Sequence, residues 1–244
     1  MTKQIVIARY KEDIEWTKYL DYETIIYSKG GPVETNHKVI QMPNIGMGGA
    51  TFWYHIIENY DNLADITLFT QGHPFDADFE TLKGWGPDEK SVKELQDFYF
   101  NLPENFVCSP NCFVNVIADR FSSPPNYNQR HHDCFIYYSS NWREWIDNFL
   151  DPTHIINFYE PTLMYRNGQL SLTKEAIRSN SKEYYIKLMD HWKYDNPIGE
   201  WLFEISAAYM FNIGRDGRRF NYRHDLIDVS NLNDYSSWMY EINE

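Results

Sequence analysis

The sequence predicts an α/β fold: a single domain built on a mainly parallel, doubly wound sheet flanked by helices. Three observations predict it. Short apolar segments alternate with segments of helical periodicity through the first half of the chain. Each apolar segment stops at glycine, proline or charged residues, as buried strands do. The chain has 244 residues, of which 43% are hydrophobic, and this is enough to build a sizeable core.

The first third of the chain contains four segments that we expect to be strands. They are β-branched or aromatic, which favours pleated structure over helix. They cover residues 4–8, 23–28, 38–42 and 66–70. Apolar residues at helical spacing predict helices at residues 13–20 and 52–59, between the first and second strands and between the third and fourth. Units of strand, helix and strand form parallel sheets.

The rest of the chain mixes both patterns. Helices are predicted at residues 89–99, 141–150, 174–178, 181–192 and 198–211, and strands at residues 155–159 and 168–173. Thr173 followed by Lys174 is typical of a helix N-terminus. Residues 101–134 are irregular and too long for a simple connection, so we expect a functional loop or short strands there. Residues 229–244 are expected to be a terminal segment without chemistry.

Composition limits the classes of function. A net charge of −13 and a pI near 5.0 argue against nucleic acid as the main partner, because polyanions are repelled. Aromatic residues make up 17% of the chain, and Tyr and Trp are suited to sugar- and base-binding surfaces as well as to cores. Three cysteines without a second pair do not form a zinc site. The thiols and the polar N-terminus predict a cytoplasmic protein without an integral membrane segment.

Two aspartates, Asp76 and Asp78, follow the fourth predicted strand. Ligands of α/β sheets bind outside the carboxyl ends of the strands, which is where these carboxylates fall. Two carboxylates one residue apart can share Mg²⁺ or Mn²⁺ and leave coordination positions for phosphate oxygens. The other interpretation is that both residues only stabilise a loop.

A glycine-rich loop, residues 43–51, separates the third predicted strand from the helix at residues 52–59. Backbone N–H groups and a helix N-terminus in such a loop can approach an anion or a ribose closely. The spacing matches neither the P-loop nor the dinucleotide fingerprint. Glycines that permit tight packing of the helix on the sheet are the other interpretation.

Two features near the C-terminus add candidate residues. Glu200 and Glu204 lie four residues apart on an otherwise apolar predicted helix, so one of them is a candidate general base. The other interpretation is that Glu200 lies in the solvated first turn of the helix and that Glu204 pairs with an arginine. Residues 215–224 are locally basic and could neutralise phosphate, and His224 is a candidate metal ligand. A solvated basic tail is the alternative for that segment.

The order of these motifs resembles that of GT-A-type glycosyltransferases. The likeness covers roughly residues 3–212 and rests on Ala8-Arg9-Tyr10 after the first strand, Asn44-Ile45-Gly46 before a helix, and the D-A-D motif. The stretch from Tyr60 to Pro74 also resembles a set of proteins of unassigned function, and the motif order resembles that of some small virus-encoded glycosyltransferase domains.

The resemblance implies a role for each matching residue. Ala8, Arg9 and Tyr10 would meet the nucleotide base, and Asn44 and Gly46 would lie near the base or ribose. Asp76 and Asp78 would engage the ribose and a Mn²⁺ or Mg²⁺ on the diphosphate, with Asp78 as the direct ligand. Glu200 or Glu204 would deprotonate the acceptor if the reaction inverts the anomeric centre. The domain would span residues 1–228, with a nucleotide-binding half near residues 1–80 and an acceptor half near residues 81–228.

We therefore expect a metal-dependent glycosyltransferase that moves a sugar from a nucleotide-diphosphate donor to a hydroxyl of a glycan or another acceptor. One alternative is a metal-dependent hydrolase of phosphate or glycosidic bonds that uses Asp76, Asp78 and one of His131, His132 and His224. The other is a non-catalytic carbohydrate-binding protein, which the aromatic content favours and which needs no metal.

Overall fold

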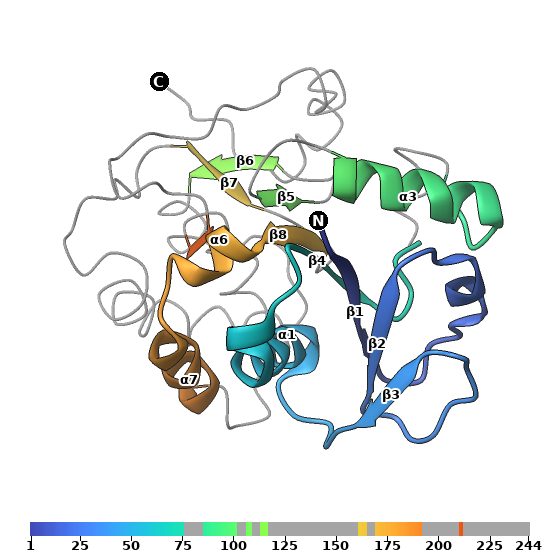
Figure 1. The fold of residues 1–244 in the computed structure, drawn as a ribbon, viewed down its shortest axis with the longest axis horizontal. Coiled ribbons are helices and arrows are strands. Elements are labelled where there is room, and N and C mark those ends of the chain that lie inside the picture. Colours follow the sequence, from blue (N-terminus) through green and yellow to red (C-terminus); the bar gives the residue numbers. More distant parts are fainter. Residues whose placement is uncertain are drawn as a thin grey trace, which may run out of the picture.

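The computed structural model describes residues 1–75, 85–101, 106–108, 113–116, 161–164, 169–191 and 210–211. Within these ranges the strands form a six-stranded sheet with the order β3-β2-β1-β4-β8-β5 and a separate pair, β6-β7. Figure 1 shows the large sheet as the centre of the fold, with helices on both of its faces.

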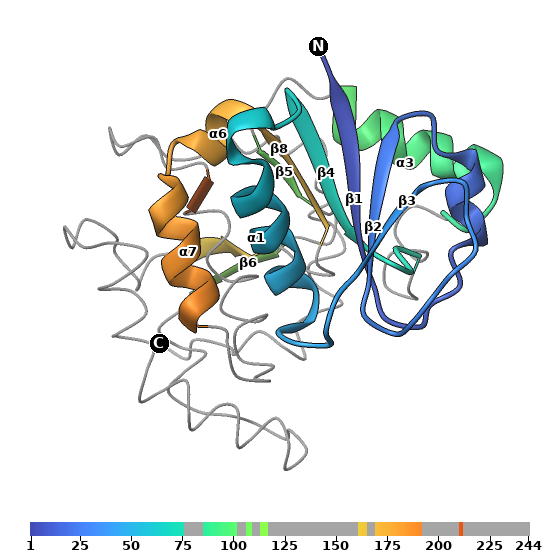
Figure 2. The same ribbon diagram turned by 60° about the horizontal axis from the view of Figure 1, so that its bottom comes forward.

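Four neighbouring strands of the large sheet run parallel. They are β1 (Lys3–Arg9), β2 (Glu23–Ser28), β3 (Lys38–Gln41) and β4 (Ile66–Gln71). β1 pairs with β2 on one side and with β4 on the other, and β2 pairs with β3. In Figure 2 these strands run down the page, so their carboxyl ends lie together at the bottom, where the chain also enters α1.

The other side of the sheet breaks the parallel pattern. β8 (Leu170–Thr173) is antiparallel to β4, and β5 (Phe106–Cys108) is antiparallel to β8. The separate pair consists of β6 (Phe113–Val116) and β7 (Pro161–Met164). The sheet is therefore mixed, and its parallel pairing is confined to β1, β2, β3 and β4.

One face of the sheet is covered by α1 (Met47–Asn59), and α7 (Lys182–His191) packs on the outside of α1. Phe52 of α1 packs on Phe69 of β4 with ring centroids 5.2 Å apart, while Trp53 faces Tyr185 of α7 at 5.7 Å. Because α1 lies between the sheet and a second helix, its apolar residues extend around most of its circumference.

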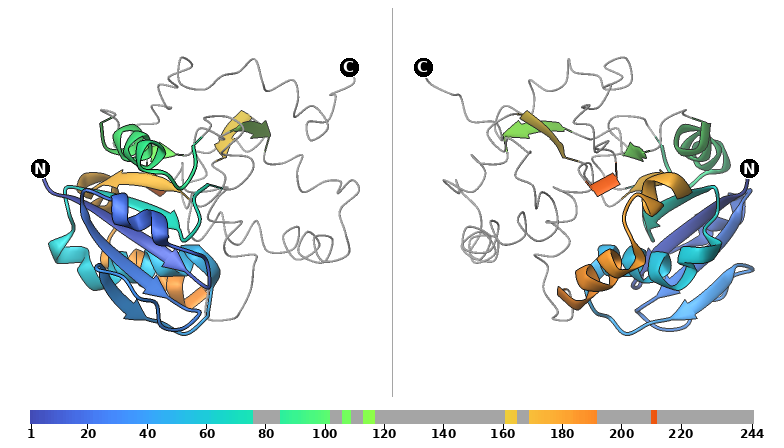
Figure 3. Two further views of the ribbon diagram at one scale, coloured as in Figure 1. Left: turned by 90° about the vertical axis from the view of Figure 1, so that its right-hand side faces the viewer. Right: turned by 60° about the vertical axis from the view of Figure 1, so that its left-hand side comes forward.

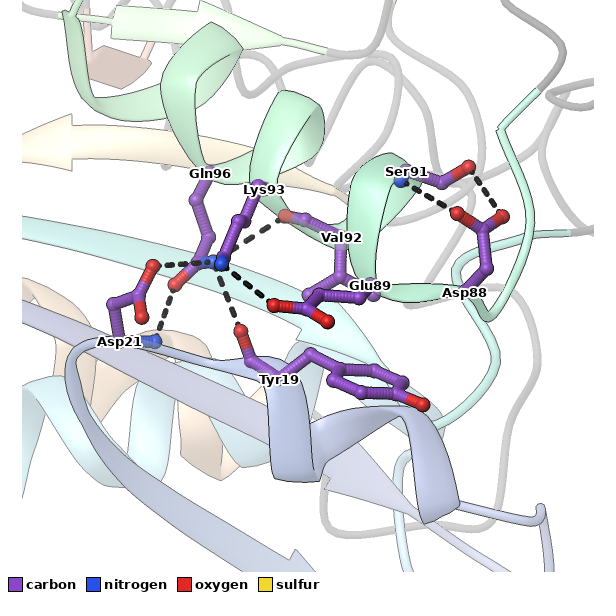
Figure 4. A network of polar contacts seen from close by, with 8 residues as sticks. All are labelled: Tyr19, Asp21, Asp88, Glu89, Ser91, Val92, Lys93 and Gln96. Carbon is purple, nitrogen blue, oxygen red and sulfur yellow. Dashed lines mark hydrogen bonds and ion pairs between the residues drawn. The ribbon is translucent and has the colours of Figure 1, made fainter.

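The opposite face carries α3 (Glu89–Asn101) and the 3₁₀-helix η1 (Glu15–Tyr19), as Figure 3 shows from two sides. Val92, Leu95 and Tyr99 of α3 pack in one core with Trp16 and with Ile5 and Ile7 of β1. Gln96, which is 2% exposed, joins α3 to the end of η1: it accepts a hydrogen bond from Asp21 N at 2.8 Å and donates to Tyr19 O at 3.4 Å (Figure 4).

A polar cluster around Asp65 ties the amino edge of the sheet together. Its carboxylate accepts hydrogen bonds from Thr2 N at 2.7 Å and from Lys174 Nζ at 2.8 Å. These bonds hold the pKa of Asp65 at about 2, below its usual value of 3.8, with the Lys174 bond as the largest cause. Lys174 begins the short helix α6 (Lys174–Arg178), while η2 (Tyr60–Asn62) leads towards β4. The starts of β1 and β4 and the end of β8 are thereby fixed.

The predicted α/β class, the mainly parallel sheet and the helices on both faces are confirmed. Residues 13–20 form a 3₁₀-helix at residues 15–19 instead of an α-helix. The helix predicted at residues 52–59 begins five residues earlier, so two glycines of the expected loop lie in its first turn. The elements predicted at residues 141–150, 155–159 and most of 198–211 lie outside the described residues.

Candidate functional site

The chain reverses its order across the sheet between β1 and β4. From β1 it proceeds outwards to β2 and β3, and it then returns through α1 to β4 on the other side of β1. In α/β sheets ligands bind outside the carboxyl ends of the strands, at the point where the strand order reverses. The candidate site is therefore the edge formed by the residues that follow β1, β2, β3 and β4.

Arg9 at the end of β1 organises this edge internally. Its Nε donates to Glu12 O at 3.0 Å, and its Nη1 donates to Tyr10 O at 3.2 Å and to Ser28 Oγ at 3.0 Å. The guanidinium thus links the loop after β1 to the end of β2. The sequence interpretation gave Arg9 a contact with a nucleotide base, and the structure gives it several contacts within the protein.

Tyr10, the next residue, presents its ring at the surface. Its side chain is 44% exposed, and Lys11 Nζ lies 5.0 Å from the ring centroid. Its backbone is fixed, because Tyr10 N donates to Glu12 Oε2 at 2.6 Å and the Tyr10 carbonyl lies directly against Gly30. An exposed aromatic ring on a fixed backbone is suited to stacking on a base or a sugar.

Lys29 connects the end of β2 to the loop before α1. Its backbone N donates to Arg9 O at 2.8 Å and its Nζ donates to Ile45 O at 2.8 Å. Asn44 in that loop is exposed. Gly46 precedes α1 with φ of 66°, a left-handed conformation that favours glycine, and it brings the N-terminus of α1 to the edge. The first turn of α1 contains no acidic residue, which leaves the positive end of the helix uncompensated by its own sequence.

Residues 72–75 form the post-β4 segment, and its backbone carbonyls accept hydrogen bonds from side chains. Trp16 Nε1 donates to Gly72 O at 2.9 Å, Gln71 Nε2 to His73 O at 3.1 Å, and Gln169 Nε2 to Pro74 O at 3.0 Å. Phe75 is 1% exposed, and its ring meets that of Trp16 edge to face. This segment leads directly to Asp76 in the sequence.

An open pocket of about 670 Å³ adjoins this edge, between the loop after β1 and the loop that joins β2 to β3. Its lining includes Arg9, Lys11, Glu12, Glu34, Asn36 and His37. Several of these groups are already bonded within the protein, since His37 Nε2 lies 2.9 Å from Thr17 O and Glu12 accepts from Tyr10. Charges of both signs line the pocket, so it does not by itself select an anion.

Behind the edge, His55 of α1 is fully buried against the sheet. Its Nδ1 is 3.0 Å from the hydroxyl of Tyr27, and in the described part of the chain its Nε2 has no hydrogen-bond partner. Burial lowers the pKa of His55 to about 4, with a smaller contribution from Lys38, so the imidazole is neutral at physiological pH. Burial likewise raises the pKa of Tyr27 to about 12, ahead of a smaller effect of Tyr54.

The structure brings four of the predicted site residues to one edge: Arg9, Tyr10, Asn44 and Gly46. Ala8 lies one residue inside β1 and is 8% exposed, so its side chain is packed against the protein. Asp76, Asp78, Glu200, Glu204 and His224 lie outside the described residues, and their roles stay predictions. Within the described ranges, no group of three or more His, Cys, Asp and Glu side chains could hold a metal ion.

The sequence interpretation missed three residues that shape the edge: Trp16, Lys29 and Gln169. Trp16 and Lys29 each lay within a recognisable element or turn, but nothing in the sequence identified their partners. Gln169 carried one weak signal, namely an amide directly before an apolar strand.

Residues 5–216 match a family model described as protein of unknown function (DUF3431), and the chain belongs to that family. The match includes all the described edge residues discussed above and excludes His224. Comparison with curated proteins finds no match. None of the helices in the described part of the chain has the length and apolar character needed to cross a bilayer.

Proposed function

We propose that the protein is a glycosyltransferase of the GT-A type, which binds a nucleotide-diphosphate sugar at the carboxyl edge of its sheet and transfers the sugar to a hydroxyl acceptor. The observation that carries the proposal is the convergence at this edge. The ends of β1 and β4 flank the chain reversal, the N-terminus of α1 reaches the same edge, and the sequence places an aspartate pair directly after the post-β4 segment.

The described residues support separate parts of a nucleotide site. Tyr10 offers an exposed ring for the base, while Lys29 joins the loop that contains Asn44 to the end of β2 through Ile45 O. The start of α1 supplies backbone N–H groups and a positive dipole end, which favour a diphosphate. An acidic protein needs such focused positive groups in order to bind a phosphate ester.

The side chains of the aspartate pair have the chemistry that a divalent cation requires. Asp76 and Asp78 supply hard carboxylate oxygens, which fit Mn²⁺ or Mg²⁺ better than softer metals. Because the described residues contain no cluster of three candidate ligands, further ligands would come from other parts of the chain or from the diphosphate. A bound divalent cation would hold the diphosphate and offset the charge that develops as the sugar leaves.

The proposal also gives roles to three residues near the C-terminus. Glu200 or Glu204 would accept the proton of the attacking hydroxyl in an inverting reaction. Substitution by glutamine of the one that acts as the base should lower the transfer rate without changing the affinity for the donor nucleotide, and a retaining enzyme would not show this dependence. His224 would be a further metal ligand.

Ligand-induced stabilisation tests the proposal directly. The melting temperature of the full chain should be measured with ADP, GDP, CDP and UDP, and with their common sugar conjugates, each with Mn²⁺, with Mg²⁺ and with chelator. A ligand at one hundred times its Kd adds about 2.7 kcal/mol to the free energy of unfolding. We expect a shift that requires both a metal and one particular nucleotide, and a transfer assay with that sugar then tests catalysis.

Two variants sharpen the result. Asp78→Asn should remove the metal-dependent shift, whereas Asp61→Asn should keep it, because Asp61 is an exposed carboxylate in η2, which precedes β4. If no nucleotide shifts the melting temperature with any metal, the glycosyltransferase proposal is wrong. A shift with glycans alone in the presence of chelator would instead identify a carbohydrate-binding protein, and release of sugar or phosphate to water alone would identify a hydrolase.

A further inference from the structure

The post-β4 segment has one exposed side chain, and buried side chains from other parts of the chain bind the backbone carbonyls on both sides of it. Gly72, Pro74 and Phe75 are buried, whereas His73 is exposed. The carbonyl before His73 accepts a hydrogen bond from Trp16, and the carbonyl of Pro74 after it accepts one from Gln169. These donors lie 56 and 95 residues away from their acceptors in the sequence.

Both clamps use side chains whose polar groups are costly to bury. Gln169 is fully buried, and Tyr99 OH donates to its Oε1 at 3.4 Å, so its amide is fixed from both ends. Trp16 is 2% exposed, and its indole N–H is directed at Gly72 O. The carbonyl of His73 itself accepts from Gln71. Three consecutive backbone carbonyls are thus bonded to side chains, which leaves the segment little conformational freedom.

The imidazole of His73 is oriented further by its neighbour. Its ring lies 6.1 Å from that of Phe75 at an interplanar angle of 84°, and Phe75 is held in turn by Trp16. An exposed imidazole on such a fixed backbone stands at the end of β4, beside the reversal of strand order. Pre-organised polar groups of this kind are typical of ligand sites.

We propose that His73 is a ligand-binding residue of this edge, where its imidazole donates a hydrogen bond to a phosphate oxygen of the bound nucleoside diphosphate, and that Trp16 and Gln169 are positioning residues that act through it. This inference rests on the proposed function. Imidazole is a suitable donor, because either ring nitrogen can carry the proton that is donated.

The test measures the affinity of the full chain for ADP, GDP, CDP and UDP in the presence of Mn²⁺ by titration calorimetry. His73→Ala should lower the affinity for the diphosphate that wild type binds by about tenfold or more, as expected for a lost hydrogen bond to a charged group. His73→Asn or His73→Gln should restore part of the affinity, since the two amides place a donor near Nδ1 and Nε2 respectively. Lys187→Ala is the control and should retain wild-type affinity, because Lys187 is exposed on α7, which packs on the outside of α1.

A matched pair of buried glutamines tests the positioning role. Gln169→Met removes the donor to Pro74 O, and Trp16→Phe removes the donor to Gly72 O while it keeps the ring. Gln96→Met is the control, because Gln96 is equally buried and hydrogen-bonded but joins α3 to η1 (Figure 4). We expect Gln169→Met and Trp16→Phe to lower the affinity severalfold, and Gln96→Met to lower only the melting temperature.

A double-mutant cycle separates positioning from general destabilisation. If Gln169 acts through His73, Gln169→Met should cost no further affinity once His73 is alanine. A second readout is the ¹⁵N shift of the His73 imidazole, which should move when wild type binds the diphosphate.

The outcomes are distinct. Wild type that binds no diphosphate overturns both the proposed function and this inference. Wild type that binds, with His73→Ala at unchanged affinity and no movement of the imidazole signal, overturns the inference alone. Independent effects of the His73 and Gln169 substitutions overturn the positioning role.

Discussion

Gly30→Ala should disrupt the site edge more than alanine at Gly31, Gly72 or Gly86. Gly30 follows β2 and packs directly against the loop after β1. A Cβ atom at this position would lie 1.6 Å from Tyr10 O and 2.3 Å from Tyr10 C. Both contacts are with backbone, which cannot rotate away as a side chain can, so the ends of β1 and β2 must separate.

The magnitude follows from the size of the overlap. A Cβ rarely approaches an oxygen closer than 3.0 Å, so the Gly30 region must open by well over an ångström. Overpacking of this kind costs about 3 kcal/mol or more in the free energy of unfolding. The displacement would also strain the bond from Lys29 N to Arg9 O and the position of Tyr10, so nucleotide affinity should fall as well.

Three further glycines provide a graded comparison. At Gly72 the added Cβ would lie 2.9 Å from Glu12 Oε2 and 3.1 Å from Glu12 Cβ, so the Glu12 side chain must shift and strain its bond to Tyr10 N, at a cost that we expect to be below that of Gly31→Ala. At Gly86 the nearest atom is 3.5 Å away, an ordinary contact, and we expect almost none. At Gly31 no atom lies within 4 Å of the added Cβ, but φ is 105°. Backbone strain alone should therefore lower the free energy of unfolding of Gly31→Ala, by about 1 to 2 kcal/mol.

Urea denaturation of the four variants gives the ranking, and calorimetry gives their affinity for nucleotide. The steric argument predicts Gly30→Ala as the least stable, followed by Gly31→Ala, then Gly72→Ala and Gly86→Ala. A Gly30→Ala protein within about 0.5 kcal/mol of wild type would refute the close approach of Gly30 to Tyr10.

Three other predictions concern titration and hydrogen bonding. The pKa of His55 is about 4 in the folded protein and about 6.5 in the unfolded chain. The contribution of the neutral imidazole to the free energy of unfolding should therefore be fully present above pH 6.5 and fall by on the order of 3 kcal/mol as the pH drops to 4. Urea midpoints across this range should show the loss, and His55→Gln should flatten it. The lowered pKa of Asp65 contributes stability that is present above about pH 4 and lost as the pH falls to about 2. Asp65→Asn should therefore melt below wild type at pH 7 and together with it at pH 2, and a gap that persists at pH 2 would contradict the assignment. Arg9→Lys should lower the melting temperature nearly as much as Arg9→Met, because one ammonium cannot reach the three acceptors of the guanidinium, and an unchanged Arg9→Lys protein would show that these bonds are dispensable.

The strands of the parallel half were predictable because local pattern and tertiary role agree there. Residues 5–8 and 25–27 are buried on both faces of the sheet, and each of these runs is therefore apolar without interruption. The start of α1 was not predictable from propensity, because Gly48 and Gly49 weaken a helix in isolation. Packing between the sheet and α7 outweighs that cost. The antiparallel direction of β8 depends on pairing with β4 about a hundred residues earlier, and no local pattern records it.

The candidate site was predictable at the level of strand ends and not at the level of contacts. Placing Tyr10 and Asn44 at one edge required only the parallel order of the strands. The roles of Lys29, Trp16 and Gln169 depend on which backbone carbonyl each side chain reaches, and those acceptors are far away in the sequence or in loops of irregular conformation. Arg9 illustrates the same limit, since an arginine at a strand end has the same sequence signature whether it binds a ligand or the protein's own carbonyls.

The loop after β1 and the post-β4 segment are held by different sets of contacts, and Glu12 contacts both of them. On the β1 side its carboxylate accepts the Tyr10 N–H and its carbonyl accepts Arg9 Nε. On the β4 side the same carboxylate lies against Gly72, the first residue of the segment that presents His73. A displacement of either side must therefore move Glu12 or break its bond to Tyr10. The backbone that carries Tyr10 and the backbone that precedes His73 therefore both lie against the Glu12 side chain, which places the proposed base and phosphate contacts on adjoining loops.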